Sequence, residues 1–406
     1  MGSKLPLLSN SLDLRLAAFL STLLLLGGVV SDCVFAQAGG ADAKAAAAGA
    51  IAGSYTEDPI DPNQRTKLSN IGAILIAGAF DATQQNDFDT YYKTYALPRW
   101  TLKSSLSNLN KYRQELINNL RQARTGQVHD YLNNLVLDYM NKLVKSDKYH
   151  PAVRFNAMLM IGELNSVDGN PPTPLESVLP ILLAAVNDPN QIVPLKVAAL
   201  TGINRHVTLG VKNPQSQNQI LATMLKIAAV ADTADGSDAG QVWMRKQAAE
   251  ILGSLGSLGN NNQVVQVLLG IIGDAKASFL TRSKAAEALG KLKFAGAGGL
   301  NALDLAKPLC QLMCDACSAE LSSSKETKLS SEDHRRNLKT PLAPVMDCLK
   351  ALKPLAKNQT QQTALTNLQK IFDDLFKDLD NAKIESEELK KSVENCQSKL
   401  TDWLKK

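Results

Sequence analysis

Four segments of the chain repeat one residue pattern, and this repeat restricts the fold more than any other feature of the sequence. Each segment opens on a basic residue. Counted from that basic residue, Ala stands three positions later, an aliphatic residue seven positions later, and Gly or Asn eight positions later. The opening residues are Arg154, Lys196, Arg245 and Arg282, which lie 42, 49 and 37 residues apart. A period in this range is typical of stacked units that each consist of two helices.

Each position of the pattern has a physical interpretation. The Ala is small enough for two helices to cross there, and the aliphatic residue lies on the same helix face and fills a core. Gly or Asn at the eighth position suits the left-handed end of a helix. An acidic residue, which precedes each basic one by seven or eight positions, can cap the second helix or pair with a basic residue of its own or the neighbouring unit. These acidic residues are Asp147, Asp188, Asp238 and Asp274.

The hydrophobic spacing around the repeat predicts four pairs of helices separated by Pro- or Gly-containing breaks. The predicted pairs are 128–146 with 151–165, 175–187 with 192–206, 215–231 with 240–256, and 261–273 with 278–293. Aromatic residues make up only 5% of the chain and long alternating Val, Ile and Thr runs are absent, so little or no sheet is expected. The predicted fold class is therefore all-α, an α-solenoid of antiparallel helix pairs.

The turn Asp and the basic residue that follows it resemble the signature positions of the HEAT-repeat family. The resemblance covers residues 127–293, and the flanks lack the pattern: residues 65–126 are expected to form an N-terminal helical cap and residues 294–356 a degenerate, Cys-containing helical pair. With its N-terminal leader, the chain is similar to exported bacterial HEAT-repeat domain proteins of unassigned function. The resemblance implies protein–protein interaction rather than a named reaction.

The N-terminal 38 residues are typical of a signal peptide. Lys4 and Arg15 provide the positive charge, residues 16–30 are uncharged and apolar, and Ala36-Gln37-Ala38 matches a cleavage site. An uncleaved N-terminal anchor is the alternative interpretation. Residues 39–64 are predicted to be an Ala-, Gly- and Pro-containing linker. We therefore expect an exported protein, periplasmic or secreted after cleavage near Ala38.

No catalytic, cofactor or metal site is predicted from the sequence. The four histidines, His129, His150, His206 and His334, include no pair at the four-residue spacing of a helical metal site. His150 and His206 are interpreted as helix-terminus residues. The net charge of +5 is too small to indicate a nucleic-acid-binding protein.

Five cysteines remain beyond the leader, and they are disulfide candidates in an oxidising compartment: Cys310, Cys314, Cys317, Cys348 and Cys396. The first three form one stripe on a predicted helix. A bridge from this stripe to Cys348 is one interpretation, and buried free thiols are another. A zinc site would need Cys348 or His334 as its fourth ligand.

Residues 93–124 carry seven basic side chains and one acidic one, Glu115, beside several aromatic residues. The basic residues are Lys93, Arg99, Lys103, Lys111, Arg113, Arg121 and Arg124, and the aromatic ones are Tyr91, Tyr92, Tyr95 and Trp100. One interpretation is a weak anionic contact surface for polysaccharide, phospholipid headgroups or an acidic protein. In the other, the stems of Arg113 and Arg124 lie along the core, with Asp130 or Asp138 as partners.

Apolar residues in segment 357–406 recur at intervals of three and four from Leu365 to Trp403, which predicts a C-terminal heptad helix or hairpin. A continuous helix could form a parallel coiled coil through residues 360–404, with Cys396 bridging a homodimer. Alternatively, the segment breaks near Asp380-Asn381 and folds back, or packs along the solenoid as its cap.

These features favour a non-enzymatic scaffold of the cell envelope that binds a protein partner on the concave face of the solenoid. A structural envelope protein that self-associates through the C-terminal coiled coil is the alternative. An enzyme on a HEAT-like fold is the third hypothesis, for which no acid–base pair stands out in the sequence.

Overall fold

A computed structural model describes residues 54–231, 239–295, 298–326 and 329–405. The predicted signal peptide, most of the predicted linker and Asp238 lie outside these residues. Residues 55–406 form one compact unit. Residues 55–64, which we predicted as linker, therefore belong to this unit: the Asp58 carboxylate accepts hydrogen bonds from the hydroxyls of Tyr139 (2.6 Å) and Tyr149 (2.8 Å).

The described residues form fifteen α-helices and only two short strands, so the all-α prediction is confirmed. The helices are α3 (Leu68–Ala77), α4 (Ala82–Tyr91), α5 (Leu109–Ala123), α6 (Gln127–Lys145), α7 (Pro151–Glu163), α8 (Leu179–Asn187), α9 (Val193–Leu209), α10 (Pro214–Ala228), α11 (Ala239–Leu255), α12 (Gln263–Gly273), α13 (Phe279–Gly290), α14 (Ala302–Glu326), α15 (Ser331–Leu352), α16 (Gln359–Asp380) and α17 (Ser386–Leu404). The strands β1 (Asn165–Val167) and β2 (Thr173–Pro174) pair antiparallel in the α7–α8 connection.

Shorter 3-10 and π segments supplement the α-helices, mainly near the N-terminal end of the described residues. They are η1 (Pro62–Lys67), η2 (Tyr92–Ala96), η3 (Pro98–Thr101), η4 (Lys103–Asn108), η5 (Glu176–Val178), η6 (Asn260–Asn262) and η7 (Lys353–Leu355).

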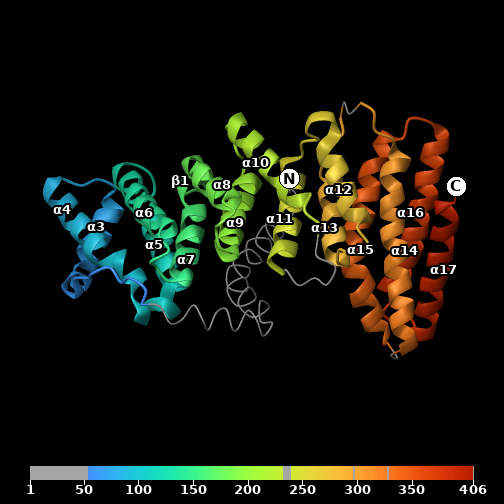
Figure 1. The fold of residues 1–406 in the computed structure, drawn as a ribbon, viewed down its shortest axis with the longest axis horizontal. Helices are drawn as coiled ribbons and strands as arrows, with labels where there is room; N and C mark the ends of the chain where they lie inside the picture. The colour runs from blue at the N-terminus through green and yellow to red at the C-terminus, as the bar shows by residue number, and fades with distance from the viewer. Residues whose placement is uncertain (1–53, 232–238, 296–297, 327–328, 406) are drawn as a thin grey trace, which may run out of the picture. The chain divides into compact units, whose positions relative to one another are not determined.

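Helices α6 to α13 match the four predicted pairs to within a few residues at most ends. Local signals explain several helix starts: His150 caps α7 ahead of Pro151, and Asn213 caps α10 ahead of Pro214. The second helices of successive pairs, α7, α9, α11 and α13, pack side by side, and α15 continues this layer (Figure 1). The first helices α8, α10 and α12 form the other layer, with α14 next to α12. The core lies between the two layers.

Neighbouring second helices approach so closely that glycine is needed at the contact. A Cβ added at Gly253 would lie 2.6 Å from Ala288 Cα, and one added at Gly162 would lie 2.7 Å from Gly202 Cα. Gly290 meets Cys348 in the same way, at 2.9 Å. These glycines have ordinary helical backbone angles. The assignment of the eighth repeat position to a left-handed helix end is therefore wrong for them: the side chain is missing because a helix backbone occupies its place.

In two of the four segments, the opening arginine links successive helix pairs through a buried guanidinium and an ion pair. Arg282 donates to the Ile272 carbonyl at 2.7 Å and to the Asp315 carboxylate of the next pair at 2.8 Å. Arg245 reaches the Ala228 carbonyl and Asp274 in the same way. For the acidic residues before each segment, the sequence left open whether they cap a helix or pair with a basic residue. Asp274 pairs with Arg245 of the neighbouring helix pair.

The remaining signature residues have local roles or no fixed partner. Arg154 donates to the Val144 carbonyl and to Gln191 instead of an acid, and burial lowers the pKa of this guanidinium, while Asp147 opposes the shift. Asp188 accepts the Asn190 amide N–H in its turn. Lys196 is half-buried on α9.

The C-terminal segment is a hairpin of α16 and α17, because the helix ends at Asp380 and restarts at Ser386. Leu389, Val393, Cys396 and Leu400 of the heptad stripe are buried within the chain. The prediction of one continuous helix, which a parallel coiled coil through residues 360–404 would need, is therefore wrong. The alternative prediction of a break near Asp380-Asn381 is confirmed. The stripe packs against α14 and α16 of its own chain.

Candidate functional site

The positions of the second helices opposite the core form a mostly polar row that crosses four helix pairs. Counted from the basic residue that opens each segment, these are the second, fifth and ninth positions, which lie opposite the buried third and seventh ones. We call the row the second-helix face. It consists of Asn156, Leu159 and Glu163 on α7; Ala198, Thr201 and Arg205 on α9; Gln247, Glu250 and Ser254 on α11; and Lys284, Glu287 and Lys291 at α13. Leu159 in this row is apolar, and Ala198 and Gln247 are buried.

The α7–α9 part of this face holds a carboxylate between two guanidinium groups. Glu163 Oε2 lies 3.2 Å from Arg113 Nε, and its side chain is still 30% exposed. Arg205 donates to the Gly162 carbonyl at 3.3 Å and to Asn165 Oδ1 at 2.5 Å. Burial raises the pKa of Glu163, while Arg113 and Arg205 oppose this shift. Arg113 is thus buried behind Glu163, which stays partly exposed, and Arg205 is held in a fixed direction by Gly162 and Asn165.

The α11–α13 part continues the face with both signs of charge. The Glu287 carboxylate bridges Lys284 and Lys291, each at 2.7 Å. Lys246, next to the face on α11, is half-buried, and burial together with the nearby Lys284 ammonium lowers its pKa. A surface of paired, partly desolvated charges can recognise polar and charged groups of a partner, but it presents no nucleophile with an adjacent base.

A buried histidine network supports the α7–α9 part of the face from behind. His129 of α6 is fully buried, and its Nε2 lies 3.0 Å from Asp168 Oδ2. Asn165 donates to the other Asp168 oxygen at 2.6 Å, and Arg205 binds Asn165. The hydrogen bond to Asp168 raises the pKa of His129 despite its burial. The network thus fixes the Arg205 guanidinium at the face.

We expect the His129–Asp168 pair to make the free energy of unfolding decrease as pH rises above neutral. Because the folded pKa of His129 is raised, its contribution is complete below the unfolded value of about 6.5 and is lost as pH rises through the folded value. Urea denaturation of wild type and His129→Gln, from pH 5.5 to 9, measures this. The free-energy difference between the two should shrink as pH rises; a constant difference would contradict a charged His129.

Three of the seven basic residues of segment 93–124 form ion pairs within the chain. Arg99 pairs with Glu115, Lys93 with Asp89 at 2.8 Å, and Arg113 with Glu163. Among the aromatic residues, Tyr91, Tyr92 and Trp100 are buried. The anionic contact surface thus loses three of its seven cations, and the predicted core position of Arg113 is correct, with Glu163 instead of Asp130 or Asp138 as its partner.

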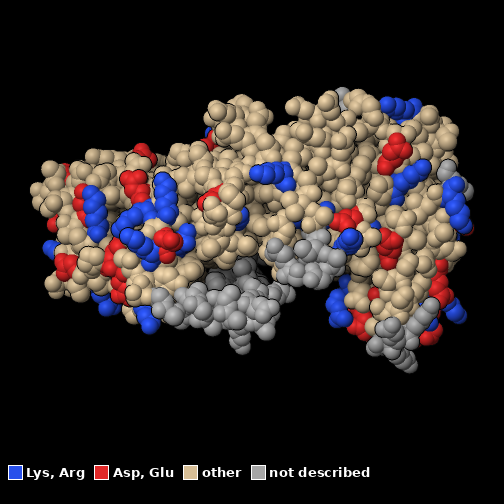
Figure 2. All heavy atoms as spheres, viewed as in Figure 1, with Lys and Arg blue, Asp and Glu red and all other residues tan. Residues whose placement is uncertain are grey.

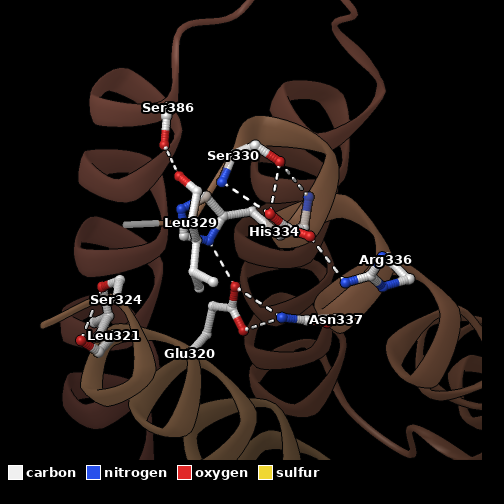
Figure 3. A network of polar contacts seen from close by, with 10 residues as sticks. Glu320, Leu321, Ser324, Leu329, Ser330, His334, Arg336, Asn337 and Ser386 are labelled. Carbon is white, nitrogen blue, oxygen red and sulfur yellow. Dashed lines mark hydrogen bonds and ion pairs between the residues drawn. The ribbon is translucent and has the colours of Figure 1, made fainter. Parts of the chain in front are cut away.

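The other histidines have structural environments. The His150 side chain accepts the Ala152 N–H at the start of α7. His206 is fully buried near the end of α9, and burial lowers its pKa to about 4. His334 of α15 lies 2.6 Å from the Glu320 carboxylate of α14, which also accepts hydrogen bonds from Asn337 (Figure 3). This buried pair joins two helices.

All five cysteines in the described residues are buried and unbridged. Of the two interpretations, the structure has the buried free thiols and not the bridge to Cys348, because the Cys310–Cys314–Cys317 stripe faces α17 while Cys348 packs against Gly290. Over the described parts of the chain, no group of three or more His, Cys, Asp or Glu side chains is placed to hold a metal ion.

A shallow hollow among the described residues lies beside the α9–α10 connection. It has a volume of about 640 Å³, is wide open to solvent, and is lined by Ser166, Thr173, Glu176 and Lys212, among others. The Glu176 carboxylate already accepts the backbone N–H groups of Lys212 and Asn213. The Glu176 carboxylate is therefore engaged in holding the α9–α10 connection to the rim of the hollow.

Charge is unevenly distributed over the surface seen in Figure 2. Lys, Arg, Asp and Glu intermingle around α5 to α7 and around α14 to α17, whereas the surface over α10 and α12 shows few of them. Helices α8 and α12 contain no charged residue, and α10 contains one, Lys226. The layer of first helices is therefore nearly uncharged, in contrast to the second-helix face.

No protein-family model, curated protein or solved structure matches the chain, so the site rests on its geometry. None of the helices in the described residues has the length and apolar character needed to cross a membrane. Sequence reasoning did not single out Glu163, Arg205 or Lys246. A signal existed for Glu163 and Arg205: the ninth position of the first two segments is charged and lies four residues beyond the fifth, on the same helix face.

Proposed function

We propose that this chain is a non-enzymatic, HEAT-type scaffold that binds a protein partner on the second-helix face. Its alternating helix pairs, the two layers they form and the repeated basic residue between successive pairs support a HEAT-like α-solenoid. In a solenoid one helix layer lines the concave surface that binds a partner. We assign this role to the layer of α7, α9, α11 and α13.

The observation that carries the proposal is the row of half-buried charges on this layer. Glu163, Arg205, Glu250 and Glu287 are each partly covered, and most are held by neighbouring polar groups. Because they are already partly desolvated and fixed in direction, a partner loses less free energy in ordering and dehydrating them than it would at mobile surface charges. The mixed signs favour a protein with charges of both signs over a nucleic acid.

The proposed location is the exported fraction of the cell, periplasmic or secreted, with the N-terminal segment as signal peptide. The alternative of self-association through a C-terminal coiled coil has lost its support, since the apolar stripe of α17 is covered by the same chain. No second function is favoured by a specific observation.

Site-specific photo-crosslinking tests the proposed binding face. A photoreactive phenylalanine analogue replaces Thr201, Glu250 or Glu287 on the second-helix face, one at a time, in the full chain expressed in its native host. Matched controls carry it at Ala222 of α10 or Gln266 of α12, which are exposed on the first-helix layer. We expect one discrete protein adduct from the second-helix positions, weakened at least tenfold at the control positions.

A Lys246→Glu variant provides a second criterion, because it reverses a charge beside the face. We expect it to reduce the adduct formed at Glu250 or Thr201 while leaving the thermal unfolding temperature within a few degrees of wild type. Adducts of equal yield from Ala222 and Gln266, or none from any position, would contradict the proposed face.

A further inference from the structure

The cysteine stripe of α14 faces the last helix of the chain along its whole length. Cys310 Sγ lies 3.7 Å from the Leu400 carbonyl oxygen, and Cys314 Sγ lies 3.7 Å from Thr401 Oγ1. One turn further along α14, the Cys317 thiol is in hydrogen-bond contact with Cys396 of α17. The two helices run antiparallel, since higher numbers on α14 meet lower numbers on α17.

We propose that Cys317 and Cys396 form an intrachain disulfide site that fastens α17 to α14. The residues next to them confirm the alignment independently: Gln397 Nε2 donates to Ser318 Oγ at 2.6 Å. Two side-chain pairs, 317 with 396 and 318 with 397, thus lie opposite each other across one helix contact. Both thiols are buried, at 0% and 4% exposure, so neither can turn away into solvent without moving α17. A disulfide requires neighbouring sulfurs on closely spaced Cβ atoms, and the register set by Ser318 and Gln397 brings these two buried thiols together.

Bond formation is a thiol–disulfide exchange with a protein or small-molecule disulfide as oxidant. One cysteine thiolate attacks the oxidant and releases one of its thiols; the second cysteine then attacks the mixed disulfide and releases the other. Overall, two cysteine thiols and one disulfide yield the Cys317–Cys396 bond and two oxidant-derived thiols. The Cys396 contact, burial and the nearby Glu320 carboxylate keep the pKa of Cys317 well above its usual range. Exchange is therefore slow until α17 separates from α14.

The bond would close a loop of about 80 residues that contains α15, α16 and most of α17. Cross-linking so long a loop restricts the unfolded chain and stabilises the folded one. It would fasten the hairpin that covers α14, which lies beside the last repeat pair. Whether the bond forms in the cell rests on the proposed export, because an oxidising compartment is needed for it to persist.

The test uses the purified full chain incubated with oxidised glutathione, with and without low urea to open α17. After blocking of free thiols, peptide mapping by mass spectrometry locates every bridge. We expect the peptides of Cys317 and Cys396 to be joined, faster in low urea, and the unfolding temperature to rise by about 5–10 °C. Cys396→Ser should abolish the rise, whereas the matched buried variant Cys348→Ser should keep both the bridge and the rise.

Peptide mapping of the wild type needs no variant, so the result stands even if a serine variant folds poorly. Free thiols at both positions after oxidation, or a bridge from either residue to Cys310, Cys314 or Cys348, would overturn the site. Peptide mapping of protein isolated from the native host tests the proposed export separately from the disulfide site. If Cys317 and Cys396 are reduced in the host but form the bridge in vitro, the result contradicts export and leaves the disulfide site intact.

Discussion

Gly253→Ala should lower the free energy of unfolding by about 2–3 kcal/mol, although the change adds only one methyl group. The new Cβ would lie 2.6 Å from Ala288 Cα and 2.8 Å from Ala288 Cβ, distances at which α11 or α13 must move. Since the obstacle is helix backbone instead of a flexible side chain, local rotamer changes do not relieve it. Ala also favours the helical backbone by about 1 kcal/mol over Gly, so the steric cost must exceed this gain.

Gly270→Ala is the matched control, because Gly270 lies within α12 and a Cβ added there meets no atom within 4 Å. The same chemical change should therefore raise the free energy of unfolding, by about 0.5–1 kcal/mol. Urea denaturation followed by circular dichroism measures both variants. Equal effects of the two substitutions would contradict the close approach of α11 and α13.

Arg282→Met should cost about 3 kcal/mol of stability, because it removes the buried cation that links the α12–α13 pair to α14. The guanidinium donates to the Ile272 carbonyl and to Asp315, and its side chain is only 3% exposed. Met has a similar length and apolar volume, so packing is largely kept. The loss of stability then measures the cost of leaving the Ile272 carbonyl and the Asp315 carboxylate without the arginine donor.

Lys350→Met is the control for Arg282→Met, since Lys350 also pairs with an acid, Asp347, but both side chains are exposed at 54% and 78%. Exposed pairs contribute roughly 0–1 kcal/mol, so this variant should stay close to wild type. Thermal and urea denaturation decide between the two outcomes. If Arg282→Met were as stable as Lys350→Met, the buried arginine link between successive pairs would be without energetic consequence.

Much of the fold was predictable because helix formation and helix ends depend on local residues. The pattern that follows Arg154, Lys196, Arg245 and Arg282 gave helix pairs whose bounds agree with α6 to α13. Apolar spacing identifies a buried helix face wherever the helix lies, and Pro, Gly and capping residues define the ends. The same local information indicated a break near Asp380-Asn381, where α16 ends.

The candidate site was harder to predict from the sequence, because its residues differ from other surface residues only in their three-dimensional surroundings. Glu163 and Arg205 look like ordinary surface charges in the sequence, and only the side-by-side packing of α7 and α9 brings them into one row. The partner of Arg113 was assigned to Asp130 or Asp138, yet Glu163 lies beside it. Ion pairs between helices depend on crossing positions, which sequence spacing does not define.

The sequence by itself determined the helices, their pairing and the small residues at the helix crossings, since these follow from backbone propensity and the periodicity of apolar side chains. Only the tertiary structure decided how those features are used. Gly253 and Gly290 proved to be points of backbone contact between helices of different pairs instead of left-handed helix ends, and Cys396 proved to be buried beside Cys317 of α14. In both cases the deciding quantity is a distance between residues far apart in the chain, which depends on how whole helices pack.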